Sequence, residues 1–311
     1  MTENIKINKN QLVSVIVVTY NSSKFIRETL ESIKLQSYSN IELIISDDCS
    51  SDNTIEICQK WLEENKSRFT TTKLITVSKN TGIPANCNRG LNESHGSLLK
   101  FIAGDDVILP DFICESLNAF QTDSQVAVTY TSSKTIDEKG QVIKSLPTEK
   151  YKSGFIFEEL FFVKFWPAAP SFMFTRQAVM EVGGFDESIV VEDYLLVLKL
   201  AQKYKIQHIN KFLTYYRIHS SNTSKNNDFL FKGHLDTINR FKNYGGYKKR
   251  MRQLKVSMIN SYSRRNKKEA LNLIVNNLNT ISFKTIWVII FLRLIIPYKY
   301  HNKVFKREIV N

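Results

Sequence analysis

The first part of the chain alternates between short apolar runs and longer stretches in which apolar residues recur at helical spacing. The apolar runs are Val13–Tyr20, Ile41–Asp48, Lys73–Ser78, Leu98–Ala103 and Val126–Thr131. The helical stretches are Ser23–Leu35, Asn53–Glu64, Ala85–Glu93 and a fourth after Pro110, a residue that suits the first helical turn. Apolar strands joined by helical crossovers form parallel sheets covered on both faces. The pattern therefore predicts an α/β fold with a mostly parallel sheet.

Beyond about residue 132 the pattern changes. A hairpin is predicted around Lys139 and Gly140, followed by an aromatic-rich segment, a helix, a strand and a polar stretch. These are Thr135–Ile143, Phe155–Phe174, Leu195–Gln202, Ile206–Ile218 and Ser220–Asp228. The polar stretch marks a boundary, so we predict a main domain over residues 1–224, with halves at about 12–110 and 111–224. A helical region is predicted over 225–311.

Composition fits a folded protein. The 311 residues are 42% hydrophobic and 12% aromatic, enough to build a core, which excludes general disorder. The four cysteines (Cys49, Cys58, Cys87, Cys114) form no C-x-x-C pair, which favours reduced thiols over a zinc site or disulfides. The N-terminus is polar and no apolar run reaches the roughly 20 residues of a spanning helix. We therefore expect a cytoplasmic protein.

The positive charge is concentrated in the C-terminal region. The whole chain carries 43 Lys+Arg and 30 Asp+Glu, whereas residues 225–311 alone carry 19 and 4, a net charge of +15. The remaining residues hold 24 and 26, a net charge of −2. This split argues against a nucleic-acid groove in the main domain. It favours contact of the C-terminal region with an anionic membrane surface.

Two segments of the C-terminal region have helical patterns. In Tyr247–Lys268, apolar residues recur at helical spacing (Met251, Leu254, Met258, Tyr262) among basic ones. Ile281–Ile296 is strongly apolar but includes Lys284 and Arg293. The second segment could be a helix dipping into the membrane interface, or one packed on the main domain or on a second subunit of a homo-oligomer.

Polar residues follow the ends of the predicted strands: Asn21, the pair Asp47-Asp48, Asn80 with Gly82, and the pair Asp105-Asp106. In an open parallel sheet, ligands bind beyond the carboxyl ends of the strands. The chain has neither G-x-G-x-x-G nor G-x-x-x-x-G-K-[ST], so a phosphate ligand at this acidic edge would need a bridging cation. Oxygen ligands favour Mg²⁺ or Mn²⁺ over zinc.

Seven short motifs occur in the order found in family 2 glycosyltransferases. They are VSVIVVTYN (13–21), ISDDCSSDNT (45–54), NTG-x5-NRG (80–90), FIAGDD (101–106), VGGFDE (182–187), VEDY (191–194) and YYRIHSSNTS (215–224). Over residues 12–224 the chain resembles this family of inverting enzymes. The resemblance implies a GT-A-like, Rossmann-like fold with a nucleotide-binding half (12–110) and an acceptor half (111–224).

The resemblance also implies roles for individual residues. Thr19, Tyr20 and Asn21 would line the nucleotide, and Asp47 would accept the N3–H of uracil. Asp105 would lie near the ribose, Asp106 would bind Mg²⁺ or Mn²⁺, and Asp193 would be the general base. The remaining donor-binding residues would be Asn80, Gly82, Arg217 and His219. Two departures weaken this pattern: Cys87 stands where the family often has arginine, and Ala103 where it often has an acidic residue.

Simpler structural interpretations compete with these roles. Asp47 or Asp48 could cap the turn at Ser51, and the Glu192-Asp193 pair could complement a helix dipole. Likewise, Asp106 could be a helix cap and His219 a hydrogen-bonded surface group. The aromatic run Phe155–Trp166 is typical of a core, although Trp166 could line an acceptor groove.

The expected function is transfer of a sugar, with inversion, from a nucleotide-diphosphate donor to a saccharide or lipid-linked acceptor. The role assigned to Asp47 implies that the donor is a UDP-sugar. By resemblance the setting is bacterial surface-polysaccharide assembly, such as capsule or O-antigen, on the cytoplasmic membrane face. Two other classes compete: an inactive sugar-nucleotide-binding protein and a basic nucleic-acid-binding protein. The confinement of charge to the tail and the lack of a nucleic-acid motif disfavour the latter.

Overall fold

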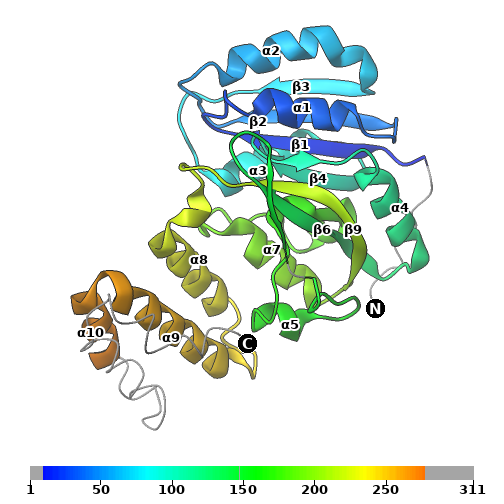
Figure 1. Ribbon diagram of the computed structural model, residues 1–311. Helices are drawn as coiled ribbons and strands as arrows, with labels where there is room; N and C mark the ends of the chain where they lie inside the picture. Colours follow the sequence, from blue (N-terminus) through cyan, green and yellow to red (C-terminus); the bar gives the residue numbers. More distant parts are fainter. Residues whose placement is uncertain (1–9, 147, 277–311) are drawn as a thin grey trace. The chain divides into compact units, whose positions relative to one another are not determined.

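The computed structural model describes residues 10–146 and 148–276 (Figure 1). The chain divides into two compact units between Asn226 and Asn227, and each is described here by itself. The predicted helix at Ile281–Ile296 lies outside the described residues.

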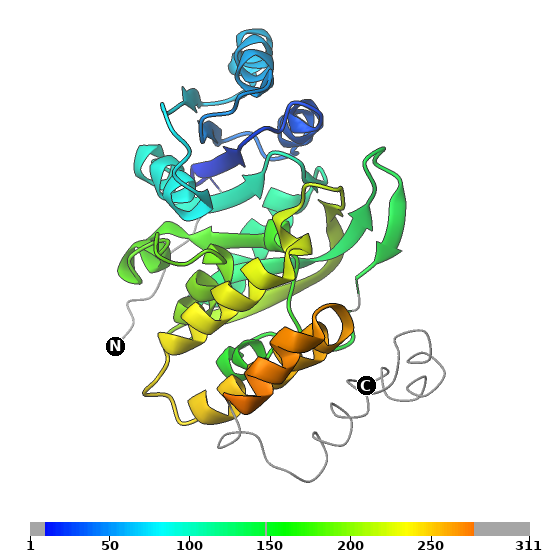
Figure 2. The same cartoon turned by 90° about the vertical axis from the view of Figure 1, so that its left-hand side faces the viewer.

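The first half of the first unit is a parallel α/β layer. Its strands are β1 (Val13–Thr19), β2 (Ile41–Asp47), β3 (Thr71–Ile75) and β4 (Leu98–Ala103), ordered β3-β2-β1-β4 with all pairs parallel. Its helices are α1 (Ile26–Lys34), α2 (Thr54–Asn65), the 3₁₀ helix η1 (Lys66–Arg68) and α3 (Ile83–Glu93). Figure 2 shows α3 on the opposite face of the sheet from α1. The predicted fold class is confirmed here, since helical crossovers bring successive strands back in the same direction.

The second half extends the same sheet as a mixed one. Its elements are β5 (Val107–Ile108), α4 (Phe112–Thr122), β6 (Val126–Ile136), β7 (Val142–Ser145), α5 (Phe157–Phe161), η2 (Ala169–Ser171), β8 (Phe172–Thr175), α6 (Arg176–Glu181), α7 (Glu192–Ala201), β9 (Lys205–Arg217) and η3 (Thr223–Lys225). β8 pairs antiparallel with β4 and β6, whereas β6 and β9 are parallel. The sheet is therefore parallel on one side of β4 and mixed on the other.

Local boundaries differ from the predictions at several points, and the third strand, predicted over Lys73–Ser78, is β3 at Thr71–Ile75. Helix α4 begins at Phe112 with Asp111 at its N-cap, so Pro110 precedes the helix. The Pro110 carbonyl instead accepts the Ser37 N–H at 2.9 Å. β6 runs on to Ile136, beyond the predicted end of the strand at Thr131, because it pairs along its length with β9 and then turns into β7.

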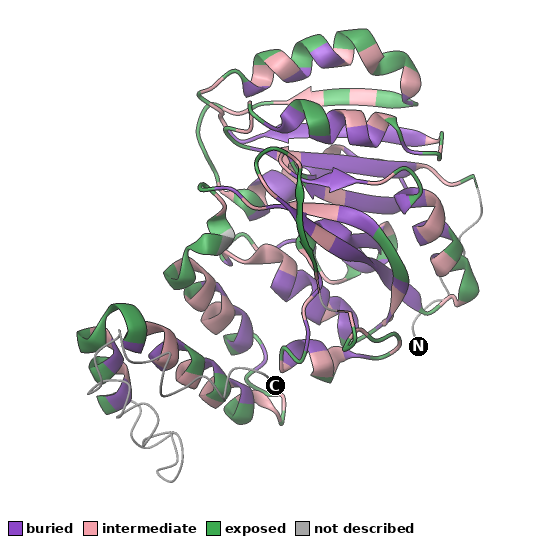
Figure 3. Ribbon diagram, viewed as in Figure 1, coloured by how far each residue is buried: buried purple, intermediate pink, exposed green. Residues whose placement is uncertain are grey.

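The core lies between the sheet and its helices, as the burial colouring in Figure 3 shows. Val15 and Val17 of β1 pack in one cluster with Ile26 and Leu30 of α1. On the other face, Gly90 of α3 approaches Ile16 so closely that a Cβ on Gly90 would lie 2.4 Å from Ile16 Cγ2. A glycine is needed there because α3 lies directly on the strand.

Half of the rings in the aromatic-rich segment are buried in the core. The buried rings are Phe161, Phe165, Phe172 and Phe174. Trp166 is half-buried, and Phe155 is 59% exposed. Within the run Phe155–Trp166, the core interpretation therefore holds for Phe161 and Phe165, and the other rings are partly or largely exposed.

The second unit, within its described residues, consists of α8 (Asn227–Asn239), α9 (Tyr247–Arg265) and α10 (Lys267–Val275). In α9, Leu254 and Met258 of the predicted apolar stripe are buried. Asn266 caps α10 by accepting the Glu269 N–H at 3.1 Å. Among the described helices, none combines the length and the apolar character that crossing a membrane requires.

Candidate active site

The carboxyl ends of β1, β2 and β4 form one polar edge. Thr19 is paired in register with Asp47, and the Asp48 N–H donates to the Thr19 carbonyl at 3.0 Å. The Thr19 hydroxyl is buried and has no hydrogen-bond partner in the described structure. Gly104 lies beside it, where a Cβ would come within 2.9 Å of that hydroxyl. The parallel sheet therefore brings these polar strand ends together.

Asp47 is fully buried in a closed turn. Ser50 donates to it twice, from the backbone N–H at 2.8 Å and from the hydroxyl at 2.5 Å. The Ser50 hydroxyl also accepts the Asn21 N–H at 2.8 Å, and the Asn21 side chain accepts the Ser51 N–H at 2.8 Å. Asn21 has φ 51°, a left-handed conformation that asparagine tolerates. In this conformation Asp47 stabilises a turn, and contact with a nucleotide base requires Ser50 to move away. Tyr20, which was also predicted to line the nucleotide, is 50% exposed.

Asp48 holds the loop between β3 and α3 at the polar edge. Its carboxylate accepts the Thr81 N–H at 2.9 Å, the Thr81 hydroxyl at 2.6 Å and the Gly82 N–H at 2.7 Å. Gly82 has φ 92°, which favours glycine, and the exposed Asn80 side chain also accepts the Gly82 N–H at 3.1 Å. Two predicted donor-binding residues, Asn80 and Gly82, are thus positioned by Asp48, for which the sequence predicted only a capping role.

Arg89 places a guanidinium group at the same edge. It donates to Asn86 Oδ1 at 2.7 Å and to Thr81 Oγ1 at 2.7 Å, and lies 3.2 Å from Asp48 Oδ1. Its side chain is 18% exposed. The family pattern often has an arginine where this chain has Cys87. Arg89 was not among the predicted site residues, although it is present within the NRG motif.

At the end of β4, Asp105 is paired with His219. The His219 Nε2 lies 2.8 Å from Asp105 Oδ2, and its Nδ1 lies 2.9 Å from the Ser221 hydroxyl. The imidazole also packs on Phe25, with ring centroids 4.9 Å apart. Hydrogen bonds at both nitrogens fix the orientation of the ring, so two predicted donor-binding residues form one polar group.

Asp106 is buried beside this pair and accepts the backbone N–H of Arg217 at 2.9 Å. Burial, and then the neighbouring Asp105, raise the pKa of Asp106 well above its usual range. The Arg217 side chain is fully buried, with Nη2 2.5 Å from Glu28 Oε2 and Nη1 donating to the Asp137 carbonyl at 3.0 Å. In this conformation Arg217 ties β9 to the strand ends instead of facing a diphosphate.

A buried lysine acts on the same carboxyl. Lys100 of β4 is fully buried, donates to the Phe172 carbonyl at 3.2 Å and lies 4.3 Å from the ring centroid of Phe112. Burial lowers the pKa of Lys100 to about 7, while the charge of Asp106 acts in the opposite direction. The sequence signal was a single lysine within the apolar run Leu98–Ala103.

A third carboxylate pair, Glu192 and Asp193, begins α7 and is half-buried. Both carboxylates act electrostatically on the buried Cys87 thiol of α3 and contribute to the raised pKa of Cys87. Burial raises the pKa of Asp193 to about 6. Burial, and then Asp193, raise the pKa of Glu192 to about 8.

Asn88 anchors the loop before α7 to α3. Its side chain accepts the Phe185 N–H at 3.0 Å and donates to the Phe185 carbonyl at 2.9 Å and to Glu187 at 2.9 Å. The start of α7 is thereby held beside α3, whose own first residues lie at the polar edge. Trp166 packs edge-to-face on Tyr194, with ring centroids 4.8 Å apart, so it lies against the first turn of α7.

The two carboxylates at the end of β4 suit a divalent cation that is completed by its substrate. Mg²⁺ is commonly held by one or two carboxylates together with substrate phosphates. Burial is the larger cause of the raised pKa of Asp106 and the neighbouring Asp105 the second, and a bound cation would act against both. In residues 10–146 and 148–276, no three His, Cys, Asp or Glu side chains are grouped to hold a metal by themselves. The residues therefore fit a cation shared with a diphosphate.

Comparison with solved structures identifies the fold. The structure of TarS from S. aureus in complex with UDP-GlcNAc superposes with a TM-score of 0.66 and 18% identity, covering 87% of this chain and 82% of that chain. The mannosyltransferase PcManGT from Pyrobaculum calidifontis, in complex with GDP-Man and Mn²⁺, gives a TM-score of 0.60 and 15% identity over 98% and 91% of the two chains. The architecture is the GT-A fold of glycosyltransferases.

Sequence comparison identifies the family. The model of "Glycosyl transferase family 2" matches residues 14–183, and the chain belongs to this family. It is 30% identical to a chondroitin synthase of Escherichia coli over 255 residues, and 30% identical to a hyaluronan synthase of Pasteurella multocida over 250 residues. These matches cover 79% and 78% of this chain but only 35% and 24% of the relatives.

Proposed function

We propose that this chain is an inverting glycosyltransferase that moves a sugar from a nucleotide-diphosphate donor to a hydroxyl of a saccharide or lipid-linked acceptor. The observation that carries this proposal is the half-buried Asp193 carboxyl at the start of α7, held against α3 near the polar edge. Family membership supports the activity, and the names of the relatives support a role in polysaccharide assembly. The bound UDP-GlcNAc and GDP-Man of the structural neighbours support a nucleotide-sugar donor.

In the proposed reaction, Asp193 accepts the proton of the acceptor hydroxyl while that oxygen attacks the anomeric carbon. The new carbon–oxygen bond forms as the bond to the diphosphate breaks, and the electron pair leaves with the nucleoside diphosphate. Glu192 has the higher pKa and is mainly protonated at neutral pH, so it adds little charge beside the base. A positioned base typically contributes about 10²–10⁴ in rate.

On the donor side, the proposed contacts come from the polar edge. Tyr20 and Asn21 would line the nucleotide, Arg89 would offer its guanidinium group to phosphate oxygens, and the Asp105–His219 pair would lie at the ribose. Asp106 would hold Mg²⁺ or Mn²⁺. When bound, the metal would offset the negative charge that develops on the leaving diphosphate.

A donor screen tests the proposed activity. Uridine donors come first because of the Asp47 assignment, and guanosine donors follow because one structural neighbour binds GDP-Man. We expect one donor class to give nucleoside diphosphate release that depends on an added saccharide or lipid-linked acceptor. Donor binding without acceptor-dependent release by any donor would instead indicate a sugar-nucleotide-binding protein.

The raised pKa of Asp193 predicts the acidic limb of the pH profile. A base with a pKa of about 6 is protonated below that pH and ionised above it, so kcat/KM should rise as the pH increases through about 6. Glu192→Gln should keep this limb, because Glu192 is still protonated where Asp193 titrates. A profile that loses the limb in Glu192→Gln would assign the base to Glu192.

We further propose that the C-terminal region attaches the enzyme to an anionic membrane surface on the cytoplasmic side. Residues 227–276 carry 12 Lys+Arg and 3 Asp+Glu. Each basic residue near such a surface contributes about 1 kcal/mol to binding. A membrane location would suit a lipid-linked acceptor, and vesicle binding of the full-length protein, described below, tests it.

A further inference from the structure

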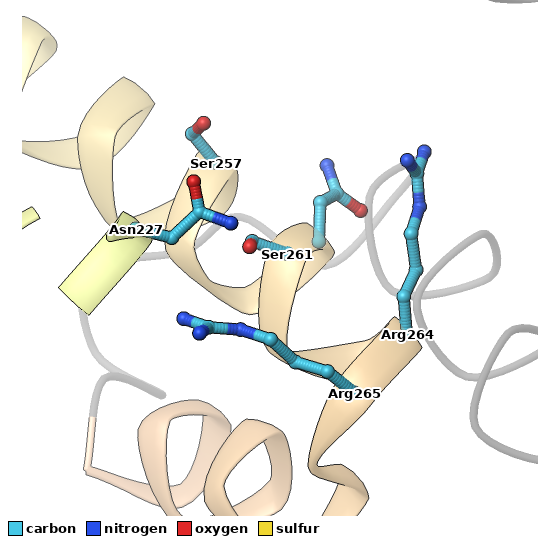
Figure 4. A pocket seen from close by; sticks show the side chains of 6 residues that line it. Asn227, Ser257, Ser261, Arg264 and Arg265 are labelled. Atoms are coloured by element: carbon cyan, nitrogen blue, oxygen red, sulfur yellow. The ribbon is translucent and has the colours of Figure 1, made fainter. Parts of the chain in front are cut away.

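A polar cavity of about 370 Å³ lies within the second unit, between the start of α8 and the last turns of α9. Its lining consists of Asn227, Ser257, Asn260, Ser261, Arg264 and Arg265. In Figure 4 the side chains of Asn227, Ser261 and Arg265 point into the same space, and Arg264 extends from the end of α9. Every lining side chain can donate a hydrogen bond, and none is apolar or acidic.

The charge around the cavity is positive. Helix α9 contains seven Lys+Arg and no acidic residue. Arg265 is paired with Asp228 and packs on the Tyr262 ring at 4.4 Å, which fixes its guanidinium group. Within the described ranges Arg264 has no ion-pair partner. One arginine is therefore held in place while the other is available to an anion.

The N-terminus of α8 adds to the preference of the cavity for an anion. Asn227 is the first residue of α8, a helix of 13 residues, so the positive end of that helix lies at the cavity. Phosphate matches the whole set, because its oxygens accept from guanidinium, amide and hydroxyl donors at once. A carboxylate would use fewer of these donors, and an apolar ligand would use none.

We propose that this cavity binds a phosphate group, and that in the cell the group belongs to an anionic lipid. The proposal rests on the proposed membrane association and makes it specific: α9 would present a defined phosphate site within a generally basic surface. Phosphate binding in this cavity does not depend on the proposed sugar transfer.

The test is cosedimentation of the full-length protein with vesicles containing phosphatidylglycerol. Arg264→Gln should weaken binding about 10-fold or more. Its control, Lys248→Gln, removes the same charge from an exposed position of α9 outside the cavity and should weaken binding by at most about 5-fold. A second pair of variants adds a negative charge instead of removing a positive one. Ser261→Asp, in the cavity, should weaken vesicle binding more than Gln253→Asp, on the exposed surface of α9.

A competition arm separates the possible sources of phosphate. Inorganic phosphate should release the wild-type protein from vesicles better than chloride of equal ionic strength. Equal effects within both variant pairs would overturn the phosphate site while leaving membrane association intact. If the wild type fails to bind the vesicles, the lipid source and the membrane proposal are both wrong. Binding of inorganic phosphate that Arg264→Gln abolishes would then assign the cavity to a soluble phosphate, and no such binding would overturn the site itself.

Discussion

Replacing Asp193 by asparagine should reduce sugar transfer by roughly 10²-fold or more and leave donor affinity nearly unchanged. Asparagine keeps the size of the side chain but cannot accept the proton of the acceptor hydroxyl. The donor contacts are proposed to lie on other elements, at the ends of β1 and β4, on α3 and after β9, so they should be unaffected. Turnover and nucleotide affinity, measured on the same preparations, check both parts of this prediction.

The neighbouring carboxyl provides a matched control. Glu192→Gln makes the same chemical change one residue away and should reduce turnover much less, since Asp193 remains to take the proton. Circular dichroism of both variants should match that of the wild type. Near-normal turnover of a folded Asp193→Asn protein would mean that another carboxylate facing the acceptor is the base.

Replacing Asp106 should weaken metal-dependent donor binding by at least the roughly 10–100-fold that loss of a residue supporting a metal ligand typically costs. Asp106→Asn is the better variant, because an amide oxygen can still accept the Arg217 N–H that Asp106 binds at 2.9 Å. In Asp106→Ala this buried N–H would lose its partner, at a cost of about 1–3 kcal/mol in stability. Calorimetry with UDP, in the presence of Mn²⁺ and then of a chelator, measures the effect.

The control for this prediction is Asp111→Asn, which changes an exposed acidic residue at the start of α4. We expect it to preserve both donor affinity and its metal dependence. If wild-type affinity is the same with chelator as with Mn²⁺, Asp106 does not hold a metal, and its burial beside Arg217 is purely structural.

The contacts of Arg217 change the interpretation of the last motif. The sequence resemblance assigned this residue to the diphosphate, but its side chain is fully buried against Glu28 and the Asp137 carbonyl. Its backbone N–H and its Nε bind the Asp105-Asp106 turn, with Nε 2.8 Å from the Asp105 carbonyl. Arg217 therefore positions the turn that carries the proposed metal ligand Asp106. Of the two residues predicted to cover the diphosphate, His219 is the one whose side chain pairs with the Asp105 carboxylate.

The sequence by itself determined the α/β class, the four parallel strands of the first half and the positions of both carboxylate pairs. Local patterns sufficed there, because a parallel strand buried on both faces is a continuous apolar run and each crossover helix has its own periodicity. In β1, β2 and β4 the end of the apolar run falls within one residue of the end of the strand. The residues after β1, β2 and β4 could therefore be assigned to one edge before any contact was known.

Only the tertiary structure decided which polar groups face each other across that edge. Three contacts join residues about 80 to 190 positions apart in the sequence. They are the antiparallel pairing of β8 with β4, the contact of Asn88 with the Phe185 loop and the pairing of Arg217 with Glu28. No local periodicity encodes such pairs, because they depend on how separately folded segments pack. The same limit applies to protonation: Asp193 has the ordinary pKa of an aspartate in an open chain, and only burial at the start of α7 raises that pKa to about 6.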